Sequence, residues 1–187
     1  MISRAADLAL GHPLENSTKA FALVCAISTT AILSVVIWAI AKYPTEPTVG
    51  QRFVMDEIPI IPWVGIYFKP ITIIVFLGFL AWASGLESVR EYAERLPLQV
   101  CRLLVIAFSL IALVYAYEVA WNFVMWSDAH ILAPSTPVDL LYNNLNASMS
   151  LPIDFTFATK RDTLYLAVSL YSVFFIQTLR SVTRPQG

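Results

Sequence analysis

Four long apolar blocks, almost free of charge, constrain the fold of this chain more than any other feature. They cover residues 20–41, 70–86, 103–126 and 163–179, and Glu118 is the only charged residue inside any of them. At about 1.5 Å per residue, helices of these lengths cross or nearly cross a hydrocarbon core of roughly 30 Å. Backbone groups in lipid must be hydrogen-bonded within their own segment, so each block is expected to be helical. The chain is therefore predicted to be an all-α integral membrane protein, with four transmembrane helices in a bundle.

The composition supports a single membrane domain and argues against nucleic-acid binding. Hydrophobic residues make up 58% of the 187 residues and charged residues 13%, and the mean hydropathy is +0.68. The formal net charge is −1 without a basic patch, so no nucleic-acid partner is expected. The expected partners are the lipid bilayer and other integral-membrane subunits, because four such helices have more apolar surface than they can bury among themselves.

The Lys and Arg residues indicate which way the chain crosses the membrane. With the N-terminus inside, the termini and the inner loop 87–102 carry seven of them, against five on the longer outer loops 42–69 and 127–162. The seven inner residues are Arg4, Lys19, Arg90, Arg95, Arg102, Arg180 and Arg184. Cytoplasmic segments of membrane proteins carry an excess of Lys and Arg. Both termini are therefore predicted to be cytoplasmic, in a cell or inner membrane.

The segments between the blocks carry Pro, Gly and charged residues that predict where helices end. Residues 1–10 are expected to form a short interfacial helix that stops at residues 11–13, Gly-His-Pro, and residues 16–18 are expected to cap the first span. Charges at helical spacing after the second block predict that its helix runs on to Pro97. The apolar stretch 58–68, interrupted by Pro, is expected on the outer leaflet, against the bundle, or as a shallow re-entrant piece.

A polar stripe on the third block is the main candidate site. Tyr115, Glu118 and Asn122 are three or four residues apart, so they share one helical face, which is expected to point into protein. Lys69, just before the second block, falls at a comparable depth and could supply the opposite charge. Three interpretations stay open: an interhelical ion pair or hydrogen-bonded network, a proton or cation site open to the outer face, and a neutral, protonated Glu118.

The chain offers few ligands for a metal or a cofactor. Asp128 and His130 flank one residue at the outer end of the third block, with Asp56 and Glu57 in the other outer loop, which makes a metal site a weak candidate. Only two histidines occur and neither lies inside a block, which excludes a haem held by two histidines of this chain. No catalytic residue, bound metal or cofactor is therefore predicted.

Small residues form rows on the first two blocks, where helices are expected to pack closely. These rows consist of Ala22, Ala26, Thr30 and Ser34 on the first block, and of Gly78, Ala81 and Gly85 on the second. Small side chains let two membrane helices approach each other more closely than large ones do. The rows therefore predict helix–helix contacts, within the chain or with a neighbour.

The loop lengths are similar to those of tetraspanins and claudins, which also have one short inner loop and two longer outer ones. The paired-cysteine motifs of those families are missing from the outer loops here. The two cysteines of this chain, Cys25 and Cys101, fall near the inner ends of spans instead. The resemblance therefore concerns the topology alone.

The function predicted from these features is that of a non-catalytic accessory subunit in a larger integral-membrane complex. The type of complex expected is a respiratory oxidase, an electron-transfer complex or a membrane-bound monooxygenase, because the spans are poor in ligands and rich in packing rows. The alternative is a small autonomous transporter or ion-handling protein that uses Glu118 and Lys69. A third hypothesis is a metal-dependent membrane enzyme with Asp128 and His130 at its centre.

Overall fold

The computed structural model describes residues 3–42, 58–61, 66–68, 70–132, 137 and 155–182. Its long helices are α1 (Ser3–Lys42), α3 (Pro70–Ser88), α5 (Leu98–Leu132) and α7 (Phe155–Val182), and the short α4 (Arg90–Ala93) lies between α3 and α5. Each long helix contains a stretch long and apolar enough to cross a membrane, at Ser17–Trp38, Pro70–Ser88, Leu98–Ala129 and Phe157–Leu179. The prediction of four helices long and apolar enough to cross a membrane is confirmed, and these helices indicate an integral membrane protein.

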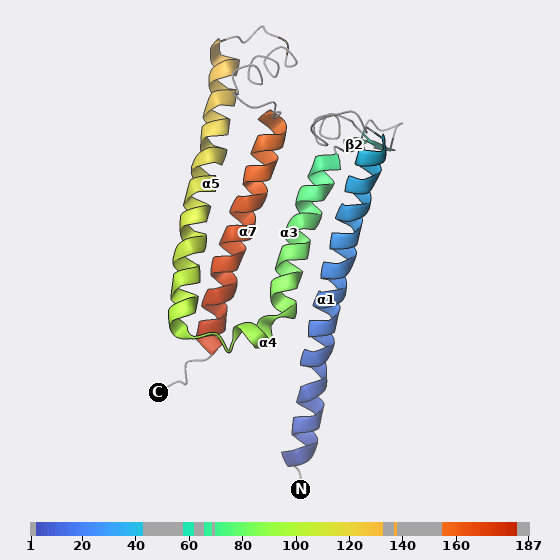
Figure 1. Cartoon of the computed structure of the whole chain (residues 1–187), viewed down its shortest axis with the longest axis vertical. Helices are drawn as coiled ribbons and strands as arrows, with labels where there is room; N and C mark the ends of the chain where they lie inside the picture. Colours follow the sequence, from blue (N-terminus) through green and yellow to red (C-terminus); the bar gives the residue numbers. More distant parts are fainter. Residues whose placement is uncertain are drawn as a thin grey trace.

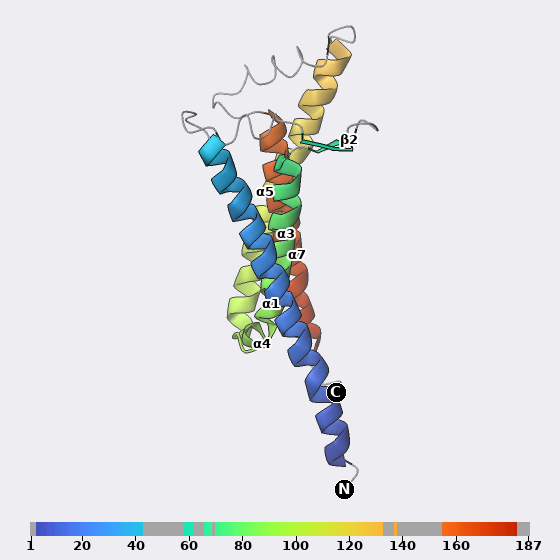
Figure 2. The same ribbon diagram turned by 90° about the vertical axis from the view of Figure 1, so that its right-hand side faces the viewer.

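The long helices stand in an open row, in the order α5, α7, α3, α1 (Figure 1). α7 packs against both α5 and α3, and α3 packs against both α7 and α1. The two chain ends and α4 lie at the same end of the long helices, here called the α4 end. The opposite end, where α3 begins after a β-hairpin, is called the hairpin end. Seen from the side, α1 crosses α3 at an angle (Figure 2). This row differs from a closed four-helix bundle, because α1 makes most of its contacts with α3.

α1 is one continuous helix of 40 residues, about 60 Å long. The predicted stop at residues 11–13 is wrong, and the predicted caps at residues 16–18 lie inside the helix. Pro13 removes its own N–H from the backbone hydrogen bonds, and a proline ring crowds the carbonyl group one turn earlier, at a total cost of about 3 kcal/mol. Good helix formers on both sides, such as Leu8 and Leu14, favour continuation of the helix.

α3 ends earlier than predicted, so the expected helix up to Pro97 is wrong. Ser88 Oγ donates a hydrogen bond of 2.7 Å to the Gly85 carbonyl oxygen, which competes with the regular backbone pattern. Val89 follows with φ −104° and ψ 12°, outside the helical region. α4 then forms a single turn, and the Pro97 carbonyl accepts the Cys101 N–H as α5 begins. The chain thus reverses direction within ten residues.

α7 begins at Phe155, eight residues before the predicted start of the fourth span at Thr163. α5 likewise continues to Leu132 instead of ending at residue 126, so the outer loop between them is shorter than predicted. The extension of α7 brings Lys160, Arg161 and Asp162 into a candidate membrane span. The expectation that Glu118 is the only ionisable residue in the spans is therefore wrong.

The apolar stretch before α3 contains a short antiparallel hairpin of β1 (Ile58–Ile61) and β2 (Ile66–Phe68). Ile58 pairs with Phe68, and the register shifts between Pro59 and Ile61. Ile favours extended backbone, and Pro is tolerated in a two-stranded ribbon because each strand has an unpaired edge. The sequence predicted only an irregular apolar segment here.

The two small-residue rows differ in whether they pack against another helix. A Cβ atom at Gly78 would lie 3.3 Å from Leu164 Cδ2 of α7, and one at Gly85 would lie 3.4 Å from Cys25 Sγ of α1, so the row on α3 does permit close packing. The row of Ala22, Ala26, Thr30 and Ser34 is exposed along its whole length. Ser28, only 2% exposed, marks the side of α1 that faces α3. The predicted close packing is confirmed on α3, but the row on α1 contacts none of the described helices closely.

Candidate functional site

The polar stripe of α5 lies along its contact with α7. The rings of Tyr115 and Tyr165 are in contact, with centroids 4.9 Å apart and an interplanar angle of 35°. Asn122 is buried, at 7% exposure, and Glu118 is half-buried. The stripe is therefore at least partly covered by the neighbouring helix.

Along the axis of α5, Glu118 lies on the side of the hairpin end and not midway along the bilayer-crossing stretch. α5 and α7 run antiparallel (Figure 1), so one turn outward from Tyr115 on α5 corresponds to one turn back from Tyr165 on α7. One turn back from Tyr165 is Asp162. The helical spacing thus places Glu118 at the level of Asp162.

The predicted contact between Glu118 and Lys69 stays a prediction, because Lys69 lies outside the described residues. Pro70, the next residue, begins α3, and α7 stands between α3 and α5. Within the described ranges, no hydrogen bond or ion pair reaches the carboxylate of Glu118. A direct contact would therefore have to pass across the end of α7.

A charged segment of α7 that the sequence analysis missed lies at this level. Asp162 is 2% exposed, and its Oδ1 accepts a hydrogen bond of 2.9 Å from Arg161 Nε. The same oxygen forms an ion pair with Arg161 Nη2, also at 2.9 Å. The side chain of Arg161 is 39% exposed, so its charge is only partly removed from the surface. The buried carboxylate is therefore satisfied by a neighbour in sequence.

Lys160, beside this pair, links α7 to α3. Its Nζ donates a hydrogen bond of 2.7 Å to Thr72 Oγ1, near the start of α3. The missed signal was the triplet of Lys160, Arg161 and Asp162 next to the last apolar block. Because charges usually mark the end of a span, the triplet was assigned to the outer loop. A carboxylate that follows a cation in the sequence can instead enter a span as part of an ion pair.

A second set of polar contacts joins α3 to α7 nearer the α4 end. Tyr171 Oη donates a hydrogen bond of 2.9 Å to Glu87 Oε1, and Glu87 Oε2 lies 3.4 Å from Arg90 Nε. This ion pair lacks hydrogen-bond geometry, and the buried Arg90 Nε has no hydrogen-bond partner. Arg90 Nη2 donates a long, 3.5 Å bond to Thr178 Oγ1. These contacts fix the relative height of the two helices.

The weak metal candidates are not brought together by the described part of the chain. Asp128 is exposed on α5, and the side chain of His130 is not described. Asp56 and Glu57 lie outside the described residues. Among the described residues, no group of three or more His, Cys, Asp or Glu side chains could hold a metal ion. The metal hypothesis therefore gains no support from this geometry.

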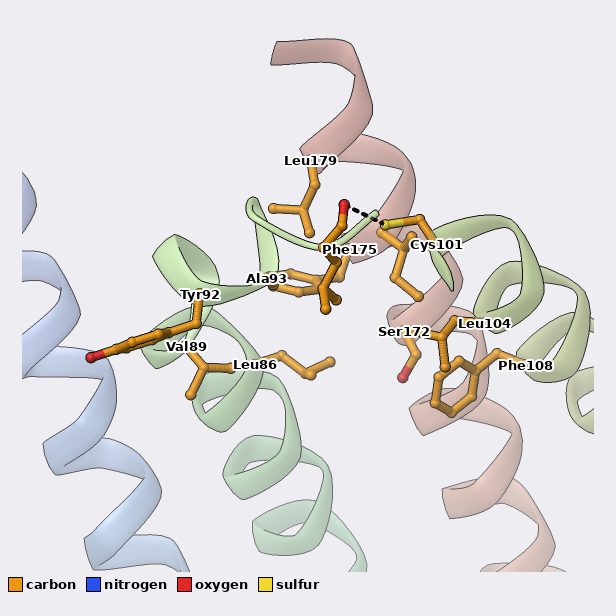
Figure 3. Close-up of a pocket in the computed structure, with 12 residues that line it drawn as sticks. Leu86, Val89, Tyr92, Ala93, Cys101, Leu104, Phe108, Ser172, Phe175 and Leu179 are labelled. Carbon is orange, nitrogen blue, oxygen red and sulfur yellow. Dashed lines mark hydrogen bonds between the residues drawn. The ribbon is translucent and has the colours of Figure 1, made fainter. Parts of the chain in front are cut away.

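An apolar groove of about 300 Å³ is a feature that the sequence did not predict. It lies at the α4 end, where α3 and α5 stand on either side of α7 (Figure 3). Its walls include Leu86 and Val89, Leu104 and Phe108 of α5, and Phe175 and Leu179 of α7. The turn through α4 closes one end. No pattern in a single apolar block signals such a groove, because it arises from the spacing of three helices.

Comparison with known proteins adds no functional information. The chain matches no protein-family model, and no curated protein or solved structure is significantly similar to it. The chemistry of the site must therefore be argued from the residues themselves. The described polar contacts join α7 to its neighbours, and this arrangement can hold helices in register.

Proposed function

We propose that this chain is a non-catalytic subunit of a larger integral-membrane complex. The observation that carries the proposal is the exposed small-residue row of α1. At 3.6 residues per turn, the row from Ala22 to Ser34 lies on the face of α1 opposite Ser28, the side that packs on α3. α1 thus presents a surface suited to close helix contact on the side away from its own neighbour.

The physical chemistry of helix association supports this interpretation. Lipid tails are as apolar as a Leu side chain, so membrane helices associate through close packing and hydrogen bonds instead of hydrophobic burial. Small residues permit this close packing. Large exposed side chains suit lipid, and they occur on α5, such as Leu113 at 68%, and on α1, such as Leu23 at 61%. The proposed contact rests on the small residues that lie between the large ones of α1. The partner is therefore expected to dock on α1.

The polar contacts support a structural role. Lys160 of α7 donates a hydrogen bond to α3, and Glu87 of α3 accepts one from α7. The carboxylate of Asp162 is paired with Arg161. The proposed complexes are respiratory oxidases, electron-transfer complexes and membrane-bound monooxygenases, in which other subunits would hold the cofactors. Cytoplasmic termini are part of the proposal, because they rest on the distribution of Lys and Arg.

The test is extraction of the tagged chain from its native membrane in a mild detergent, followed by native gel and mass analysis. We expect the chain to migrate with other membrane proteins. Ala26→Phe, which blocks the row, should release it, and Leu113→Phe, at a 68% exposed position of α5, should not.

Two results would contradict the proposal. A wild-type chain that migrates only as a monomer or homo-oligomer has no partner subunit. If the complex forms but Ala26→Phe leaves it intact, the row on α1 is not the contact. Circular dichroism of both variants would show that helical content is retained.

A further inference from the structure

We propose that the apolar groove at the α4 end holds one hydrocarbon chain of a zwitterionic membrane phospholipid, whose phosphate binds Arg95. This proposal is independent of the partner of α1. It rests on the lining of the groove, on its position at the end of the spans, and on the charges beside its rim.

The lining offers no free polar group to a ligand. Ser172 Oγ accepts a 3.0 Å hydrogen bond from Trp82 Nε1 and donates one of 2.8 Å to the Val168 carbonyl oxygen. The Cys101 thiol lies 3.9 Å from the Leu96 carbonyl oxygen, as the dashed line in Figure 3 shows. The Tyr92 hydroxyl points away from the other lining residues in the same view. Apolar cavities bind hydrocarbon and hold water poorly, so the occupant is expected to be hydrocarbon.

The rim of the groove lies where a lipid would enter. Val89 and Leu96 line the groove and remain 45% and 42% exposed. Val89 directly follows α3, the whole of which is a candidate membrane span. The groove therefore runs from the apolar level of the helices to the level of the lipid headgroups. A phospholipid molecule has the same arrangement, because its hydrocarbon chains lie at the apolar level and its phosphate lies at the headgroup level.

Arginine side chains stand beside aromatic rings of the groove. The Arg95 guanidinium carbon lies 5.9 Å from the centre of the Tyr92 ring, and that of Arg90 lies 5.7 Å from the centre of the Phe175 ring. Arg90 is engaged with Glu87 and Thr178, whereas no ion pair reaches Arg95 from the described part of the chain. A guanidinium group can bind phosphate through two parallel hydrogen bonds.

The acidic residues near Arg95 favour a zwitterionic headgroup over an anionic one. Glu91 and Glu94 are exposed and lie one and two residues from Tyr92 in the sequence, so residues of both charges follow one another in the turn that carries Arg95. An anionic lipid would be attracted by Arg95 and repelled by these carboxylates. A phosphoethanolamine headgroup offers phosphate to Arg95 and ammonium to the carboxylates, which complements both charges.

Native mass spectrometry of the purified chain with added phosphatidylethanolamine tests the proposal. We expect one lipid to bind with an affinity that Leu104→Trp, which fills the groove, lowers at least about tenfold, a loss of about 1.4 kcal/mol. Leu103→Trp is the matched control, because Leu103 is 66% exposed and does not line the groove. Ala93→Leu fills the groove from the opposite wall and decides the test if Leu104→Trp fails to fold.

Arg95→Gln and Arg102→Gln test the headgroup contact. We expect Arg95→Gln to weaken binding about tenfold, as for one charge-assisted hydrogen bond, and Arg102→Gln to leave it unchanged. Binding of phosphatidylglycerol should be weaker than that of phosphatidylethanolamine. The proposal is overturned if the folded groove-filling variants bind lipid as the wild type does, if Arg95→Gln has no effect, or if phosphatidylglycerol binds better.

Discussion

Trp82 and Ser172 join α3 to α7 by a hydrogen bond of 3.0 Å from the indole Nε1 to the hydroxyl oxygen. Ser172 is 1% exposed, and its own hydroxyl hydrogen is donated within α7. The same serine lines the apolar groove, so this bond removes from the groove the one hydroxyl that is fully buried. One contact therefore contributes both to the packing of two spans and to the apolar character of the groove.

Loss of this contact should destabilise the fold modestly. Trp82→Phe removes the donor and keeps a large apolar side chain, and we expect the free energy of unfolding in mixed micelles to fall by roughly 1–2 kcal/mol. Trp121→Phe is the control, because Trp121 is 49% exposed on α5 and stacks on Tyr117 of the same helix. Equal effects of the two variants would show that the hydrogen bond contributes nothing measurable.

The buried carboxylate of Asp162 should matter more than an exposed one. Asp162→Asn leaves Arg161 without its counter-charge, and we expect a loss of about 1–3 kcal/mol of unfolding free energy. This is less than for a fully buried pair, because the Arg161 side chain is 39% exposed. Asp128→Asn, at an exposed position of α5, should change the unfolding free energy by no more than about 0.5 kcal/mol. The same chemical unfolding assay in micelles measures both, and a smaller effect at Asp162 would contradict the assignment.

The contact at Gly78 predicts a rescue. Gly78→Val would push the helix α3 away from Leu164 of α7, because even a Cβ atom there would approach Leu164 Cδ2 to 3.3 Å. We expect a loss of about 1–3 kcal/mol from overpacking. Leu164→Ala in the same chain should restore part of the unfolding free energy. If the double variant is no more stable than Gly78→Val alone, the close approach at this point is wrong.

Double-mutant cycles can test two lysines separately. Lys160 forms a hydrogen bond to another helix, and Lys69 is predicted from the sequence to form an ion pair. Lys160→Met and Thr72→Val should be coupled by about 0.6–1.7 kcal/mol, because these side chains share a hydrogen bond. Lys69→Met and Glu118→Gln should be additive within about 0.5 kcal/mol, since α7 stands between α3 and α5. A clear coupling of Lys69 to Glu118 would instead establish the ion pair predicted from the sequence.

The sequence predicted the number and nature of the helices because lipid imposes a length and a lack of charge on each span. It failed at their ends, where local contacts decide. Ser88 ends α3 through its own hydroxyl, and Asp162 enters α7 because Arg161 neutralises it. Such contacts involve single side chains and hardly change the hydropathy averaged over a window of residues.

The order of the helices could not be read from the sequence either. In a soluble protein the apolar face of a helix identifies its packing side, but helices in lipid are apolar on every side. The row on α3, with Gly78 and Gly85, does face other helices, whereas the equally regular row on α1 from Ala22 to Ser34 does not. Small residues therefore identified surfaces suited to close contact without indicating which neighbour fills them.

The unbroken course of α1 has a mechanical consequence. Residues 3–16 continue the helix beyond its candidate span, which begins at Ser17, for about 21 Å past the α4 end (Figure 1). A continuous helix converts a change in tilt of its apolar portion into a sideways displacement of its N-terminal end. A change in the thickness of the surrounding membrane that alters this tilt would therefore displace residues 3–16.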